Sequence, residues 1–382
     1  MKGLILTCKG LEDVAAKELK DITGKSCDQQ EFCITFECNA IQLGKLAYTS
    51  QIASSVICLL FEFRASAKFE DTIAQIKSGL KDVDFSEWVS PGITFKVKAQ
   101  RTGEHEYNSQ DIMLECIKTI KEKTNLESSL DESDLCINVV IINSKGYLGI
   151  DFAGLDLSKR EYRIFAHPAA LKGTIAAGLS KLSGCKKSDT IMDPFSKSGM
   201  ISIEAALMLT KTPVNFYRKE KLAFRGLKGA NPEEIEEMIR KVDEAMLTEI
   251  TGKNYCVDAS MPSITAAQKN AKLAGVNKQI SFSRMELEWF DTKFQEKEID
   301  HIITCPPELS KRLNLSIIAK LYKELFYQLD YIMSDKGKIT VICKAHDQLS
   351  KFAEQKKFAM ESKRIISSGK EQYQIVQYSR KS

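Results

Sequence analysis

The sequence has no run of about 18 apolar residues, the length that a membrane-spanning helix needs. Its N-terminus has only a short apolar stretch that soon meets Lys9, Glu12 and Asp13, a pattern that predicts a strand and an amphipathic helix, not a signal peptide. None of the eleven cysteines forms a CxxC pair, which favours reduced core thiols, and the four histidines lie far apart. We therefore expect a cytoplasmic monomer without a membrane span or a metal site.

Charge is distributed unevenly along the 382 residues. Residues 1–150 carry a net charge of −5, whereas the remainder carries +9. A cationic half favours an anionic partner such as RNA, although an excess of this size is also ordinary for a globular protein. The 43% hydrophobic and 28% charged residues indicate a globular chain, and its length indicates two or three domains.

The order of predicted elements divides the chain. In residues 1–65, and again in residues 66–152, apolar strands alternate with amphipathic helices, as in small α+β units. Residues 153–170 look like a connector. From 171 to 382, buried apolar strands alternate with helices, which predicts a doubly wound, mostly parallel sheet and hence an α/β fold. A final hairpin is expected around Ser368-Gly369.

The first candidate motif is the segment DPFSKSG at 193–199, which follows an apolar strand and precedes a helix. In an open α/β sheet, this first turn is where a nucleotide-like ligand meets backbone amides and a helix N-terminus. A carboxylate there can hold an amino group of the ligand. The segment has neither GxGxxG nor GxxxxGK[ST], so an ordinary strand-to-helix turn also explains it.

Three further candidates follow the next strands. Asp258 is placed to bind ribose hydroxyls, or to cap a helix. Glu286 can accept an adenine amino hydrogen, although a solvated glutamate is the more common case. In TCPPE at 304–308, two prolines stiffen a strand exit, which suits the positioning of a reacting group or simply ends the strand. Because the four motifs fall on successive strands, their order predicts one site more strongly than any single match does.

Taken together, these motifs resemble the THUMP-domain class I RNA methyltransferases, especially the archaeal tRNA guanine-N2 methyltransferases and their bacterial rRNA relatives. TFKVKAQRTGEHEYNSQDI looks like a THUMP signature, and LDLSKREYRIFAHPAALKG resembles the family's RxYR…HPAPL connector. DPFSKSG is similar to the DPFCGSG cofactor loop, AQKNAKLAGV to a family helix, and TCPPELSKRL to TNPPYGxRL.

The resemblance implies a ferredoxin-like region, a THUMP RNA-binding domain and a Rossmann-like methyltransferase domain. It also implies S-adenosylmethionine as cofactor, structured RNA (above all tRNA) as partner, and methylation of guanosine N2 in tRNA or rRNA. The residues expected to bind the cofactor are Asp193, Pro194, Ser198, Gly199, Asp258, Ala259, Glu286 and Leu287. The expected catalytic residues are Cys305, Pro306, Pro307 and Glu308. The residues expected to contact RNA are Lys96, Lys98, Arg101, Lys159, Arg160, Arg163 and Arg312.

Three residues depart from the family pattern. Lys197 replaces a loop glycine, so its Cβ obstructs close backbone approach and its ammonium repels a sulfonium unless it turns to the ligand carboxylate. Cys305 replaces an asparagine whose oxygen accepts a hydrogen of the target amine, and a thiol is a poor acceptor. Glu308 replaces the aromatic residue that stacks on the target base.

These departures leave two hypotheses open. The first is an active RNA methyltransferase, which the retained Asp193, Gly199 and Asp258 favour. The second is a catalytically degenerate member that acts as an RNA-binding or partner subunit. A small-molecule methyltransferase is disfavoured, because the N-terminal module would have no purpose there.

Overall fold

The computed structural model describes residues 1–88, 90, 92–124, 126–129, 133–229, 231–310, 313–369 and 371–381. The chain forms two compact units that are interleaved in sequence. Unit 1 comprises Met1–Thr7, Ala15–Leu157 and Asn215–Glu244, and unit 2 comprises Cys8–Val14, Ser158–Val214 and Ala245–Ser382. None of the helices in the described part of the chain is long and apolar enough to cross a membrane.

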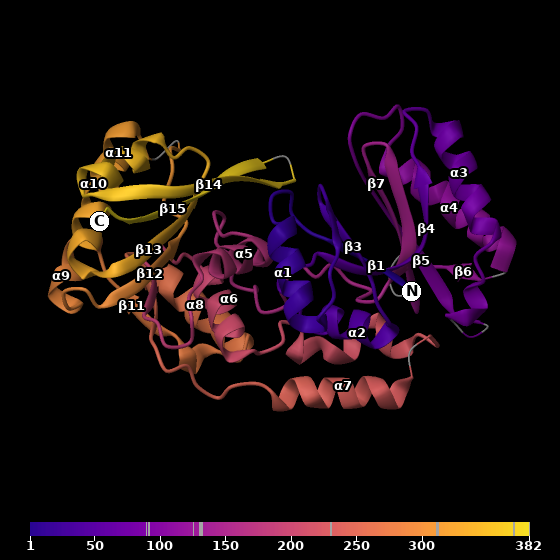
Figure 1. Ribbon diagram of the computed structural model, residues 1–382, viewed down its shortest axis with the longest axis horizontal. Coiled ribbons are helices and arrows are strands. Elements are labelled where there is room, and N and C mark those ends of the chain that lie inside the picture. Colours follow the sequence, from indigo (N-terminus) through magenta and orange to yellow (C-terminus); the bar gives the residue numbers. More distant parts are fainter. Residues whose placement is uncertain are drawn as a thin grey trace. The chain divides into compact units, whose positions relative to one another are not determined.

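Unit 1 is built on one eight-stranded sheet with the order β2-β3-β1-β4-β8-β7-β5-β6 (Figure 1). Its strands are β1 (Lys2–Leu6), β2 (Asp28–Gln30), β3 (Cys33–Glu37), β4 (Ser55–Arg64), β5 (Thr94–Thr102), β6 (Glu127–Ser128), β7 (Leu135–Ile142) and β8 (Lys145–Asp151). Its helices are α2 (Ala40–Thr49), α3 (Phe69–Lys81), α4 (Ser109–Thr124), α7 (Pro232–Glu244) and most of α1 (Glu12–Thr23).

The β4–β8 pairing joins the two regions that the sequence separates near residue 65. The strands run antiparallel, from Ile57 opposite Asp151 to Arg64 opposite Lys145. Residues 1–65 and 66–152 therefore share one continuous sheet. The short turn between β7 and β8 is Asn143-Ser144, because Lys145 already pairs with Ile142.

Local capping explains where two helices of unit 1, α2 and α4, begin. Asn39 and Gln42 form a reciprocal capping box at the start of α2, each side chain accepting the other's backbone N–H. At the start of α4, the Asn108 side chain accepts the N–H groups of Gln110 and Asp111.

Residues 215–244 belong to unit 1 although the flanking sequence belongs to unit 2. The Asn215 side-chain amide donates to the Ala47 carbonyl at 2.7 Å, and the N–H of Phe224 donates to the Phe152 carbonyl at 2.9 Å. In the last turn of α7, Asp243 accepts a hydrogen bond from the Tyr48 hydroxyl. These polar contacts fix the segment in unit 1.

Unit 2 is built on a seven-stranded sheet with the order β11-β10-β9-β12-β13-β15-β14 (Figure 1). Its strands are β9 (Ile191–Asp193), β10 (Asn254–Asp258), β11 (Ser281–Arg284), β12 (Ile299–Thr304), β13 (Met333–Cys343), β14 (Phe358–Ser368) and β15 (Glu371–Arg380). Its helices are α5 (Gly173–Ser183), α6 (Met200–Thr210), α8 (Met261–Leu273), α9 (Phe290–Lys293), α10 (Leu315–Ile332) and α11 (Asp347–Gln355). Strands β9 to β13 are parallel and the β14–β15 hairpin is antiparallel, which confirms the doubly wound α/β fold.

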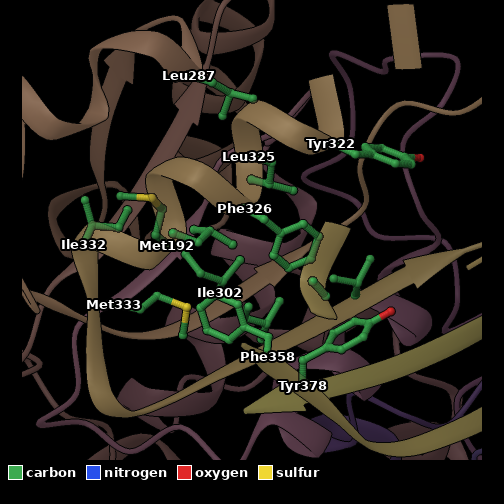
Figure 2. Packing of buried hydrophobic residues seen from close by; sticks show 14 of the residues in the cluster. Met192, Leu287, Ile302, Tyr322, Leu325, Phe326, Ile332, Met333, Phe358 and Tyr378 are labelled. Carbon is green, nitrogen blue, oxygen red and sulfur yellow. The ribbon is translucent and has the colours of Figure 1, made fainter. Parts of the chain in front are cut away.

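The hydrophobic core of unit 2 lies between α10 and the sheet. Figure 2 shows the Phe326 ring among the side chains of this cluster, and its centroid is 5.9 Å from that of Phe358 and 6.1 Å from that of Tyr378. Met192 and Ile302, on β9 and β12, belong to the same cluster. Two of the four strands that carry candidate motifs thus pack into this close-packed core.

We predict that Gly149→Ala destabilises unit 1. A Cβ at this β8 position would lie 2.3 Å from the backbone carbonyl oxygen of Cys58 on β4, so the strands would have to separate. Overpacking of this kind costs about 1–3 kcal/mol. Thermal and urea unfolding measure the effect. Gly226→Ala is the control, because a Cβ there would have no atom of the described residues within 4 Å; equal unfolding midpoints for both variants would contradict the prediction.

Candidate functional site

The candidate site lies at the carboxyl ends of β9 and β12. The chain passes from β9 to β10 on one side, whereas β12 lies on the other side of β9. This reversal of strand order is the topological switch point, where open α/β sheets bind their ligands. The hydroxyl of Thr304, at the end of β12, donates to Asp193 Oδ1, at the end of β9, at 2.7 Å.

Asp193 is a buried carboxylate with one oxygen left open. Its Oδ1 also accepts the N–H of Phe195 at 3.2 Å, whereas no described residue donates to its Oδ2. Burial raises the pKa of Asp193 to about 7, although the Thr304 hydrogen bond opposes this shift. The Oδ2 oxygen is thus an acceptor that a ligand N–H group can use, and the following Pro194 is buried.

The loop after β9 is tied to the end of β10 through Asp258. The backbone N–H of Lys197 donates to Asp258 Oδ2 at 2.8 Å, and the N–H of Ser260 donates to Oδ1 at 2.9 Å. Ser260 is the N-cap of α8, so the alternative role of Asp258 as that cap is wrong. Each carboxylate oxygen has a second lone pair, which leaves Asp258 able to accept a ligand hydroxyl as well.

Two backbone conformations in the loop explain its glycine pattern. Gly199 has φ +80°, and a Cβ there would lie 2.8 Å from the Cβ of Ala267 on α8. Lys197 has φ +52°, a left-handed conformation that favours glycine. The loop therefore keeps a glycine-type backbone at Lys197 while carrying a long cationic side chain. Ser198 is buried, and its hydroxyl has no hydrogen-bond partner among the described residues.

The Lys197 side chain reaches Cys305, so two of the three departures from the family pattern form one contact. Lys197 Nζ lies 3.2 Å from Cys305 Sγ, and Cys305 is only 8% exposed. Burial raises the pKa of the Cys305 thiol, and the nearby ammonium partly offsets the effect. The ammonium gives the sulfur a charged partner that an isolated buried thiol would lack.

The segment after β12 is held by neighbouring elements. The Tyr322 hydroxyl, on α10, donates to the Pro307 carbonyl at 2.7 Å. Glu308 turns to the end of β13, where its carboxylate accepts the backbone N–H of Lys344. Pro306 is buried beside Cys305. Glu308, the third departure from the family pattern, thus anchors the loop to the end of β13 and offers no aromatic ring.

The remaining predicted cofactor residues lie at the ends of β10 and β11. Ala259 is exposed after β10, and Glu286 is exposed after β11, 3.6 Å from the Arg284 guanidinium. The Leu287 side chain packs in the core of unit 2. The Glu286 side chain is therefore available to a ligand, whereas Leu287 can contribute only through its backbone.

Arg160, which we expected to contact RNA, is instead fully buried. Its guanidinium lies 2.6 Å from the Glu204 carboxylate on α6, and both side chains are 0% exposed. The Tyr162 hydroxyl donates to the same oxygen at 2.7 Å. The RNA-contact assignment of Arg160 is wrong, because its charge is used to neutralise a buried acid. Nearby, Arg163 donates to the Ala170 carbonyl and Lys159 is exposed.

Asn270 is a residue of the site that the sequence does not single out. Its side chain accepts the N–H of Phe165 at 3.0 Å and donates to the carbonyls of Phe165 and Ser198 at 2.9 and 3.1 Å. One buried amide thus joins the connector, α8 and the loop after β9. Asn270 lies within AQKNAKLAGV, the segment that resembles a family helix, and this resemblance was the only sequence signal for it. Its hydrogen-bond partners are distant in sequence, so the sequence does not reveal its role.

His167, two residues beyond Phe165, interacts electrostatically with residues of the loop after β9 and the end of β10. Burial and the Lys197 ammonium lower the pKa of His167, whereas Asp258 opposes them. Its Nδ1 accepts the N–H of Ala169 at 3.1 Å, which places the ring proton of neutral imidazole on Nε2. The connector therefore runs beside the loop that carries Lys197.

The predicted basic strip of unit 1 is partly engaged within the protein. Lys98 Nζ lies 3.4 Å from the buried Asp151 and 3.2 Å from the Gly154 carbonyl. Arg101 donates to the Gly103 carbonyl and lies 6.0 Å from the Tyr107 ring. Lys96 is partly exposed on the same strand. Arg312, the remaining predicted RNA contact, lies outside the described residues.

Among the described residues, no three His, Cys, Asp or Glu side chains lie close enough together to hold a metal ion. Eight of the eleven cysteines are buried, as expected for core thiols.

Comparison with known proteins matches both parts of the chain. The family model "RMKL-like, methyltransferase domain" matches residues 160–374, and the THUMP domain model matches residues 70–151. The tRNA (guanine(6)-N2)-methyltransferase of Methanocaldococcus jannaschii is 29% identical over 355 residues, which cover 90% of each chain. The ribosomal RNA large subunit methyltransferase K/L of Aliivibrio salmonicida is 28% identical, over 86% of this chain and 47% of its own length.

The fold is also that of solved structures. The structure of SMU.472 complexed with SAH superposes with a TM-score of 0.83 at 20% identity, and the match covers 100% of this chain and 98% of that chain. At this identity the likeness shows the fold alone.

We predict that Arg160→Met strongly destabilises unit 2, because it leaves the Glu204 charge buried without its cation. Loss of one partner from a buried pair costs about 3–5 kcal/mol. The double change Arg160→Met, Glu204→Met removes both charges and should recover much of the loss. Urea unfolding of the two variants and the wild type measures the difference, and a double variant no more stable than the single one would contradict this account.

We predict that Asp193→Asn stabilises the protein increasingly as pH rises. The folded pKa of about 7 lies above the ordinary value near 4, so the folded state holds the proton more tightly than the unfolded state and loses stability as pH rises through this interval. The variant and the wild type should have equal free energies of unfolding near pH 4 and differ by up to roughly a few kcal/mol above pH 7. Parallel stability curves between these pH values would contradict the assignment.

Proposed function

Because the chain belongs to the RMKL-like methyltransferase domain family and carries a THUMP domain, we propose that it methylates the exocyclic N2 of a guanosine in structured RNA, with S-adenosylmethionine as methyl donor. A tRNA is the preferred substrate, because the archaeal relative that aligns with nearly the whole chain is named a tRNA (guanine(6)-N2)-methyltransferase. Ribosomal RNA is the second candidate, on the name of the bacterial relative. With such substrates, we also propose a cytoplasmic location.

The open oxygen of Asp193 at the switch point is the observation that carries this proposal. A buried carboxylate there fits the amino group of the cofactor, and the lone pairs of Asp258 fit its ribose hydroxyls. The N-terminus of α6, which follows directly, favours the cofactor carboxylate. The donor set therefore fits S-adenosylmethionine, which supplies an activated methyl group on a cationic sulfur.

In this proposal, the loop after β12 orients the target amine. The Pro306 carbonyl accepts one amine hydrogen, a role that does not depend on side-chain identity. The Tyr322 hydrogen bond to Pro307 holds this part of the loop in place. The Cys305 sulfur, polarised by the Lys197 ammonium, takes the position of the second acceptor, and we expect slow catalysis because sulfur accepts hydrogen bonds poorly.

The same Lys197–Cys305 contact supports a second candidate function. If the ammonium excludes the cationic sulfur of the cofactor from the switch point, the protein is a THUMP-containing RNA-binding subunit without activity. Cofactor binding separates the two functions, because only the first requires it.

We expect S-adenosylmethionine, which carries the cationic sulfur, to bind the purified protein in isothermal titration calorimetry. Asp258→Ala should weaken this binding at least tenfold, since it removes both a ligand acceptor and the anchor of the Lys197 backbone. Asp347→Ala is the matched control, because its side chain is 90% exposed on α11 and should leave the affinity unchanged. No binding by the wild type would favour the second function.

A rate comparison then tests the altered loop. For an active enzyme, Cys305→Asn with Glu308→Tyr should raise single-turnover methyl transfer to a tRNA with guanosine at position 6 by one to three orders of magnitude. Cys305→Ser with Glu308→Gln is the control, which supplies no amide oxygen at 305 and no ring at 308. For a degenerate protein, the first pair should transfer nothing, and adding Lys197→Gly should restore cofactor binding before activity.

A further inference from the structure

Phe165, in the connector, is an aromatic side chain exposed beside the candidate site. It is 39% exposed although its backbone is tightly held. Both backbone polar groups of Phe165 bond to the side chain of Asn270, and the same amide donates to the Ser198 carbonyl in the loop after β9. The ring is thus presented from a fixed backbone, one side chain away from the loop that carries Lys197.

A cation covers one face of this ring. Lys269 Nζ, from α8, lies 4.8 Å from the Phe165 ring centroid, and the lysine itself is exposed. The ring thus has an ammonium on one face and remains 39% exposed. A fixed, partly exposed ring with an adjacent cation is the combination that binds an unpaired base and its phosphate.

We propose that Phe165 and Lys269 form the stacking platform for the target base, in place of the aromatic side chain that is missing at Glu308. The inference rests on the proposed function and assigns a positioning role to the connector. Glu308 cannot fill this role, because its carboxylate is bound to the Lys344 backbone and has no ring. Lys269 contributes charge for the phosphate of the same nucleotide.

The test compares Phe165→Leu with Phe165→Trp. Leucine keeps an apolar side chain but removes the ring, so kcat/KM for a tRNA with guanosine at position 6 should fall about 5- to 150-fold. Tryptophan keeps a ring and should retain activity within about threefold. The affinity for S-adenosylhomocysteine and the unfolding midpoint should be unchanged in both, which excludes a merely structural role.

Unit 2 offers a matched control. Tyr327 on α10 is 54% exposed, and the Lys356 ammonium lies 4.7 Å from its ring, yet within the described part of the chain no contact links this tyrosine to the loops at the switch point. Tyr327→Leu should therefore leave kcat/KM unchanged. For a wild type that transfers methyl groups, equal activity of Phe165→Leu and wild type, or an equal loss for Tyr327→Leu, would overturn the proposal.

A second readout separates this inference from the proposed function. Affinity for the same tRNA, measured by filter binding with saturating S-adenosylhomocysteine, should fall at least fivefold in Phe165→Leu and remain in Phe165→Trp. If the wild type binds tRNA but transfers no methyl group, the proposed activity fails, and this loss of affinity still supports the platform. Unchanged tRNA affinity in Phe165→Leu, or no tRNA binding by the wild type, overturns the platform.

Discussion

The buried charge of Glu204 is the constraint on which the arrangement of unit 2 depends. A carboxylate without solvent requires a cation and further donors, and both come from the connector, as Arg160 and Tyr162. The connector is thereby fixed against α6, the helix that begins directly after the loop at the end of β9. Asn270 then fastens its later part to the same loop. Buried polar contacts thus hold a segment without regular secondary structure in place.

Much of the fold is readable from the sequence because it depends on local patterns. Apolar strands such as those at β9, β10 and β12 alternate with helices, and this alternation predicts a parallel sheet with its motifs at one edge. The continuous sheet of unit 1 was not predictable, because the β4–β8 pairing joins residues about ninety positions apart. Arg160 was misassigned for the same reason: a surface-type residue in a connector looks solvated until its distant acid, Glu204, is known.

The candidate site shows the same division between local and distant information. The positions of Asp193, Asp258 and the loop after β12 follow from strand order, which the sequence carries. Lys197 was expected to act on a ligand through its Cβ and its charge, whereas in the fold its side chain also pairs with Cys305. The departures at Lys197 and Cys305 look independent in the sequence, but the two side chains are in contact. The effect of changing one on the chemistry therefore depends on the other.

The interleaving of the two units has a consequence for synthesis on the ribosome. The chain passes between the units five times, and each unit needs segments made both early and late. Unit 1 lacks α7 until residue 244 has left the ribosome. The first segment of unit 2, Cys8–Val14, is synthesised early, but the C-terminal strands of this unit are synthesised last. The nascent protein therefore cannot complete its folding domain by domain as most multidomain chains do, and its early intermediates expose unfinished surfaces that are natural clients for chaperones.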